Sequence, residues 1–74
     1  MVEIFKTNVN NKRLAKILLN ALHNHFPAFS FNFDLDDCDR ILRVQGEDIS
    51  FAIMRIMRMV QEHSIEICLF EDQQ

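Results

Sequence analysis

Glycine, proline and cysteine are scarce in this sequence, and each scarcity narrows the possible structures. One glycine and one proline among 74 residues favour long elements joined by short turns. A single glycine also excludes a glycine-rich phosphate-binding loop. The two cysteines, Cys38 and Cys68, have no C-x-x-C spacing and are too few for the disulfide framework of a small secreted domain. We therefore expect the protein to reside in a reducing compartment.

The sequence also lacks a concentrated positive charge and a long apolar run. Its net charge is −3, and the Lys and Arg residues are scattered along the chain, so we expect no nucleic-acid partner. No apolar run approaches the ~18 residues of a membrane span, and residues 1–30 do not have the pattern of a signal peptide. We expect no membrane partner and a cytoplasmic location.

The composition is that of a small globular domain. Apolar residues make up 49% of the chain and charged residues 26%, which excludes disorder as the main state. The length leaves room for one core, so we expect a single domain over residues 1–74. Because a chain this short hides only about 60% of the surface that its unfolded form exposes, further burial by self-association is an open possibility.

Apolar periodicity predicts six elements in the order strand, helix, strand, strand, helix, strand. Strands are predicted at residues 2–6, 29–36, 40–45 and 65–70, ahead of a polar tail at residues 71–74. A first helix is predicted over residues 12–25, with Asn10 or Asn11 as its N-cap and Pro27 as its stop. A second helix is predicted to begin after Asp48 or Ser50 and to run to about His63.

This order predicts an α+β fold, the ferredoxin-like βαββαβ sandwich, in which two helices cover one face of a four-stranded antiparallel sheet. The strand at residues 2–6 is expected in the middle, between residues 40–45 and 65–70. We expect one contiguous core, formed by residues of both helices and of three strands: Leu18, Leu22, Phe31, Phe33, Leu42, Ile53, Ile56 and Ile67.

Residues 2–6 and the helix start Leu14-Ala15-Lys16-Ile17 resemble the opening of heavy-metal-associated domains, the copper-chaperone-like family. The likeness in element order and length covers nearly the whole chain, and it implies the same fold. That family carries Met-x-Cys-x-x-Cys before the first helix, where two thiolates bind a soft metal. The corresponding positions are Asn8, Asn10 and Arg13, so this chain has no thiolate there. We therefore expect no cofactor and no tight Cu(I) or Zn(II) site.

Other candidate chemistry fails on spacing. Four aspartates lie between residues 34 and 39, but an EF-hand loop counted from Asp34 would have Asp39 and Gln45 where glycine and glutamate are needed. The three histidines do not converge on one position, as a zinc site requires. No Ser–His–Asp or Cys–His arrangement is found. We expect solvated carboxylates and no enzymatic activity.

The uncovered face of the predicted sheet carries the candidate interaction patch. If Val2 and Ile4 face the helices together with Leu42 and Val44, alternation along the strands directs Phe5, Ile41 and Phe70 to the side without helices. We expect these three residues to form an exposed apolar patch, which is typical of an interaction site. Three residues lie off the core stripe of the second helix, namely Phe51, Met54 and Met59. They either form a second partner surface, or they cover the sheet edges or are exposed singly.

The sequence does not identify a function. The leading hypothesis is a small, non-enzymatic protein-interaction module that uses the open sheet face to form a homodimer or to bind another protein. One alternative, implied by the resemblance, is a metal-handling domain of the copper-chaperone type. Another is an RNA-binding sheet platform in which Phe5 and the strand at residues 40–45 would stack on bases.

Overall fold

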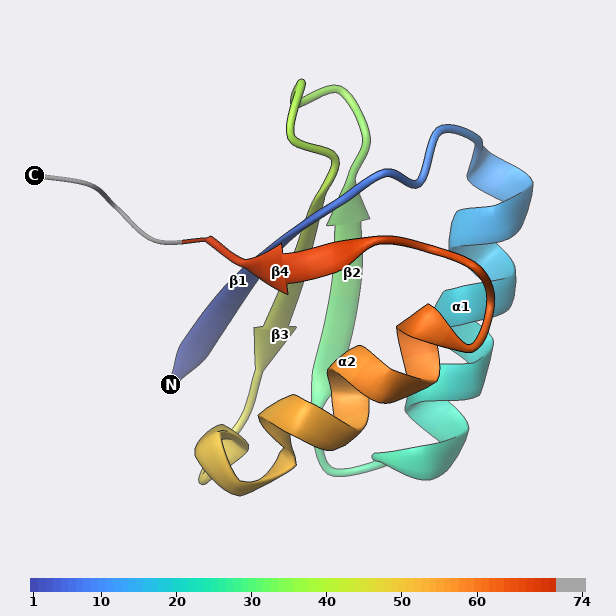
Figure 1. Cartoon of the computed structure of the whole chain (residues 1–74). Helices are drawn as coiled ribbons and strands as arrows, with labels where there is room; N and C mark the ends of the chain where they lie inside the picture. Colours follow the sequence, from blue (N-terminus) through green and yellow to red (C-terminus); the bar gives the residue numbers. More distant parts are fainter. Residues whose placement is uncertain (71–74) are drawn as a thin grey trace, which may run out of the picture.

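The computed structural model describes residues 1–70, which form an antiparallel sheet of four strands and two α-helices (Figure 1). The elements are β1 (Val2–Thr7), α1 (Lys12–His25), β2 (Ser30–Asp34), β3 (Ile41–Gln45), the 3-10 helix η1 (Ile49–Ala52), α2 (Ile53–Gln61) and β4 (Ile67–Leu69). The strand order is β2-β3-β1-β4, so β1 lies between β3 and β4 as expected. The predicted polar tail at residues 71–74 lies outside the described residues.

Helix α1 follows the sequence-based prediction at both ends. Asn11 is the N-cap, because its side-chain Oδ1 accepts a hydrogen bond of 2.8 Å from the backbone N–H of Leu14. The helix ends at His25, ahead of Pro27, and the Phe26 N–H donates to the Leu22 carbonyl at 2.8 Å. Among the residues that the structure describes, neither helix has the length and apolar character needed to cross a lipid bilayer.

The start of the second helix differs from the prediction. Neither proposed cap forms a side-chain cap bond: Asp48 has the left-handed φ of 53°, and Ser50 lies inside η1. The regular α-helical part therefore begins later, at Ile53. β2 and β4 are also shorter than expected, because pairing along β2 is formed only from Ser30 to Asp34 and along β4 only from Ile67 to Leu69.

One buried cluster forms the core. Its members come from both helices and from all four strands, so the two helices cover the same face of the sheet. Of the core residues predicted from the sequence, six belong to this cluster: Leu18, Leu22, Phe31, Leu42, Ile56 and Ile67. The other two, Phe33 and Ile53, are partly buried and pack against it. The prediction of a single contiguous core is confirmed.

The face of β1 that meets the helices is the opposite of the predicted one. Phe5 is 0% exposed and belongs to the buried cluster, whereas Val2 is 48% exposed. Phe5 pairs with Leu42 on one side and with Leu69 on the other, and directly paired residues of antiparallel strands point to the same face. The physical reason is that Phe5 has the largest apolar side chain of the strand. Burying it under the helices stabilises the fold more than burying its smaller neighbours would.

Candidate functional site

The sheet face opposite the helices is the candidate interaction surface, and we call it the open face. Strand pairing places Ile4 of β1 beside Arg43 of β3, and Arg43 beside Asn32 of β2. On the other side, Phe70 follows β4 and donates its backbone N–H to the Ile4 carbonyl at 2.9 Å. Ile4 therefore lies near the centre of the open face.

The predicted patch is wrong in its composition. Phe5 faces the helices and is fully buried. Ile41 is only 4% exposed, although it is not part of the cluster under the helices. Phe70 is 40% exposed and is the only one of the three that is accessible. Because the opposite face of β1 is buried, the accessible apolar side chains of this face are instead the exposed Val2 and Phe70 and the partly buried Ile4. We call these three residues the apolar strip.

Two cationic side chains lie next to the apolar strip. The Lys6 Nζ lies 5.1 Å from the centroid of the Phe70 ring, a cation–π geometry. Arg43 Nη1 donates a hydrogen bond of 3.0 Å to Asn32 Oδ1. Cys68, whose thiol is free and exposed, pairs with Lys6 across β1 and β4. The open face thus combines an apolar centre with a polar and cationic margin.

The loop before α1, where the resemblance would place a metal motif, is held by its own polar side chains. Asn8 Oδ1 accepts a hydrogen bond of 2.9 Å from the Glu66 N–H. Thr7 Oγ1 donates to the Arg40 carbonyl at 2.7 Å and accepts from the Val9 N–H at 3.2 Å. Val9 itself is fully buried. These contacts attach the loop to the chain segments that flank β3 and β4, and they give Asn8 a structural role.

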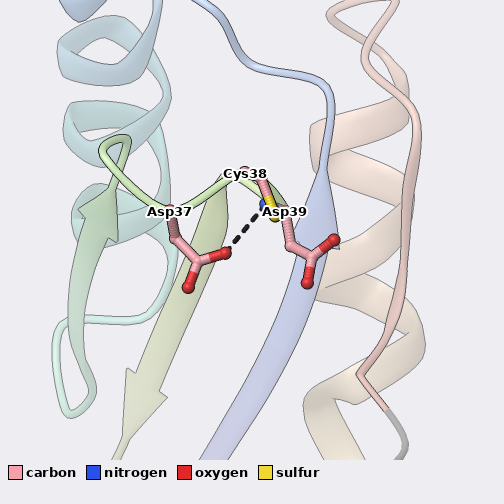
Figure 2. Close-up of side chains that lie close together, drawn as sticks. All are labelled: Asp37, Cys38 and Asp39. Carbon is pink, nitrogen blue, oxygen red and sulfur yellow. Dashed lines mark hydrogen bonds between the residues drawn. The ribbon is translucent and has the colours of Figure 1, made fainter.

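A group of three potential metal ligands lies in the turn between β2 and β3 (Figure 2). The ligand atoms of Asp37, Cys38 and Asp39 lie within 4.8 Å of one another. The Asp39 N–H donates to the Asp37 carboxylate at 2.8 Å, and the Arg40 N–H donates to the Asp37 carbonyl at 2.9 Å. Aspartate commonly stabilises a turn in this way, so the turn itself accounts for the arrangement.

His23 and His63 each make separate local contacts. His23 places its ring edge-on to Phe31, with 5.3 Å between the centroids. His63 Nδ1 lies 3.0 Å from the Met59 carbonyl at the end of α2. Within residues 1–70, neither belongs to a group of converging metal ligands. Both are explained by local packing and hydrogen bonding.

Sequence reasoning missed an aromatic group at the end of the sheet where β2 begins. Phe26 and Phe29 stack with 7° between their planes and 5.9 Å between their centroids, and Phe51 is edge-on to Phe29 at 6.5 Å. With the segment between them, these rings line a hollow of about 440 Å³. The signal was present in the sequence as Phe26-Pro27-Ala28-Phe29, but nothing local indicated that Phe51 would join it.

No protein-family model, curated protein or solved structure matches this chain. The geometry offers two surfaces with exposed apolar side chains, namely the apolar strip of the open face and the aromatic hollow beside η1. Both are suited to binding.

Proposed function

We propose that this protein is a small, non-enzymatic interaction module of the ferredoxin-like fold, and that its open face binds another protein. The element order and the strand order β2-β3-β1-β4 support the fold, because a split βαβ unit requires the first strand between the third and the fourth. The open face supports the function, because both helices pack on the other side.

The observation that carries this proposal is the apolar strip. Val2 is 48% exposed and Phe70 40%, and a backbone hydrogen bond from the Phe70 N–H to the Ile4 carbonyl places these two residues side by side. An apolar centre with a polar margin is the usual composition of a protein-binding surface. Burial stabilises such a contact by about 25 cal/mol per Å² before the costs of association, so a strip this small favours a weak complex.

No specific observation favours the two alternatives. A base-stacking platform needs exposed aromatic rings on the strands, and Phe5 is fully buried. A copper-chaperone site needs thiolates before α1, where this chain has Asn8, Asn10 and Arg13.

The test uses affinity purification from the source cells, with tagged wild type, a Val2→Ser/Phe70→Ser variant and an Ile17→Ser control. Ile17 is 49% exposed on α1, so it matches the strip in exposure but lies on the helical layer. We expect a stoichiometric protein partner with the wild type and the control, and its loss with the double variant. Circular dichroism checks that all three proteins are folded.

The free cysteines provide a second readout on the isolated complex. Cys68 lies on the open face and Cys38 in the β2–β3 turn, and both are exposed. We expect the partner to slow alkylation of Cys68 while leaving Cys38 as reactive as before. Equal alkylation of Cys68 with and without the partner, or retention of the partner by the double variant, would contradict the proposal.

A further inference from the structure

We propose that two copies of this chain associate through the exposed side of η1 and α2, where Met54 of each copy inserts into the aromatic hollow of the other. This interface is separate from the open face, since it lies on the helical layer of the domain (Figure 1). The surface consists of Glu47, Asp48, Phe51, Met54, Arg55 and Arg58, all of which are exposed, and we call it the α2 surface.

The hollow is formed by rings whose positions are fixed by packing. Phe26 and Phe29 are both only 9% exposed and stack on each other, so they form a rigid wall. Gly46 allows Phe29 to approach the backbone, because a Cβ at this position would lie 2.6 Å from Phe29 Cδ1. Phe51 stands at the rim of the hollow and remains 68% exposed. An apolar insertion would cover the exposed part of that ring.

Met54 is the side chain suited to insert into the hollow of the other copy. Its side chain is 72% exposed, and it follows Phe51 by three residues, which places both on the same side of the helical segment. Methionine is flexible and its sulfur makes favourable contacts with aromatic rings. The exposed Met54 and the aromatic hollow are therefore complementary, and both are present on every copy.

The charges of the α2 surface specify a second copy as the occupant. Glu47 and Asp48 line the hollow, and Arg58 follows Met54 by one turn of α2. A two-fold arrangement that inserts Met54 of each copy into the hollow of the other therefore brings Arg58 of each copy towards Glu47 of the other. Asp48 adds a second carboxylate at the acidic end, and Arg55 adds a second cation towards the basic end. Such self-complementarity is what an isologous dimer requires.

Arg55 packs against the aromatic wall without lining the hollow itself. Its guanidinium carbon lies 5.4 Å from the centroid of the Phe26 ring, on which it forms a cation–π contact. This contact holds the cation close to the aromatic wall, and Arg55 and Arg58 line the same neighbouring hollow beside Phe26. Arg55 therefore belongs to the same interface as Arg58.

The first test is sedimentation velocity over a range of concentrations. We expect a reversible monomer–dimer equilibrium for the wild type, and a dissociation constant raised about tenfold or more by Met54→Ser. Ile17→Ser, which removes an exposed apolar side chain from α1, should leave the equilibrium unchanged. A wild type that stays monomeric up to millimolar concentration would overturn the proposal, as would equal effects of the two variants.

Charge reversal identifies the two-fold geometry. Glu47→Arg and Arg58→Glu should each disrupt the homodimer, because each creates two like-charge contacts across the axis. Their double variant should associate again, and an equimolar mixture of the two single variants should form a heterodimer. Circular dichroism excludes unfolding as the cause of lost association. Failure of both the double variant and the mixture to associate would refute the two-fold arrangement and, with it, the inference.

Discussion

At the scale of a single residue, Phe5 is the β1 side chain that belongs to the buried core shared by the sheet and both helices. It is completely buried, and its two strand partners, Leu42 and Leu69, lie on the same face. We expect Phe5→Ala to lower the free energy of unfolding by about 3 to 5 kcal/mol, the usual cost of emptying a buried aromatic site. Urea denaturation measures this change.

Ile4 is the matched control for Phe5, because it is the next residue of β1 and points to the open face. We expect Ile4→Ala to lower the stability much less than Phe5→Ala, since Ile4 is only partly buried. If urea denaturation gave the larger loss for Ile4→Ala, the assignment of the two faces of β1 would be wrong.

The orientation of β1 shows what alternation along a strand does and does not determine. The pattern predicted that Val2 and Ile4 share one face and Phe5 the other, and this is correct. Which face meets the helices depends on the pairing of Phe5 with Leu42, and that pairing joins residues far apart in the sequence. The composition of the exposed patch followed from this choice, so the fold was predicted better than the site.

Helix α1 was predictable because its signals are local. The cap Asn11, the apolar spacing and the stop at Pro27 all lie within or next to the helix. The start of α2 depended instead on the backbone at Asp48, whose left-handed φ of 53° arises where the chain leaves β3. The preference of Asp and Ser for N-cap positions does not reveal such a bend in the backbone. Predictions of elements were therefore most accurate where the determining residues are adjacent in sequence.

The N-cap of α1 gives a prediction at the scale of an element. Asn11→Ala removes the acceptor of the Leu14 N–H and should lower the free energy of unfolding by about 1 kcal/mol. Asn10→Ala is the matched control, since Asn10 Oδ1 accepts only a bond of 3.3 Å from the exposed Asn11 side chain. Thermal unfolding followed by circular dichroism compares the two. Equal losses would mean that Asn11 does not cap the helix.

At the scale of the whole molecule, the two proposed surfaces belong to different layers. The open face is formed by the sheet, and the α2 surface by the exposed side of the helical layer. A dimer formed through α2 would therefore leave both of its open faces accessible. Such a dimer would present two copies of the apolar strip, which strengthens binding to a partner that itself has more than one site.

This separation predicts that the two surfaces respond independently to substitution, because distant sites without shared partners usually have additive effects. Val2→Ser/Phe70→Ser should leave the monomer–dimer equilibrium unchanged in sedimentation velocity. Met54→Ser should leave the protection of Cys68 by a saturating partner unchanged in the alkylation assay. If instead the strip variant abolished dimerisation while Met54→Ser did not, self-association would occur through the open face. The module would then use its sheet, rather than α2, to bind a second copy of itself.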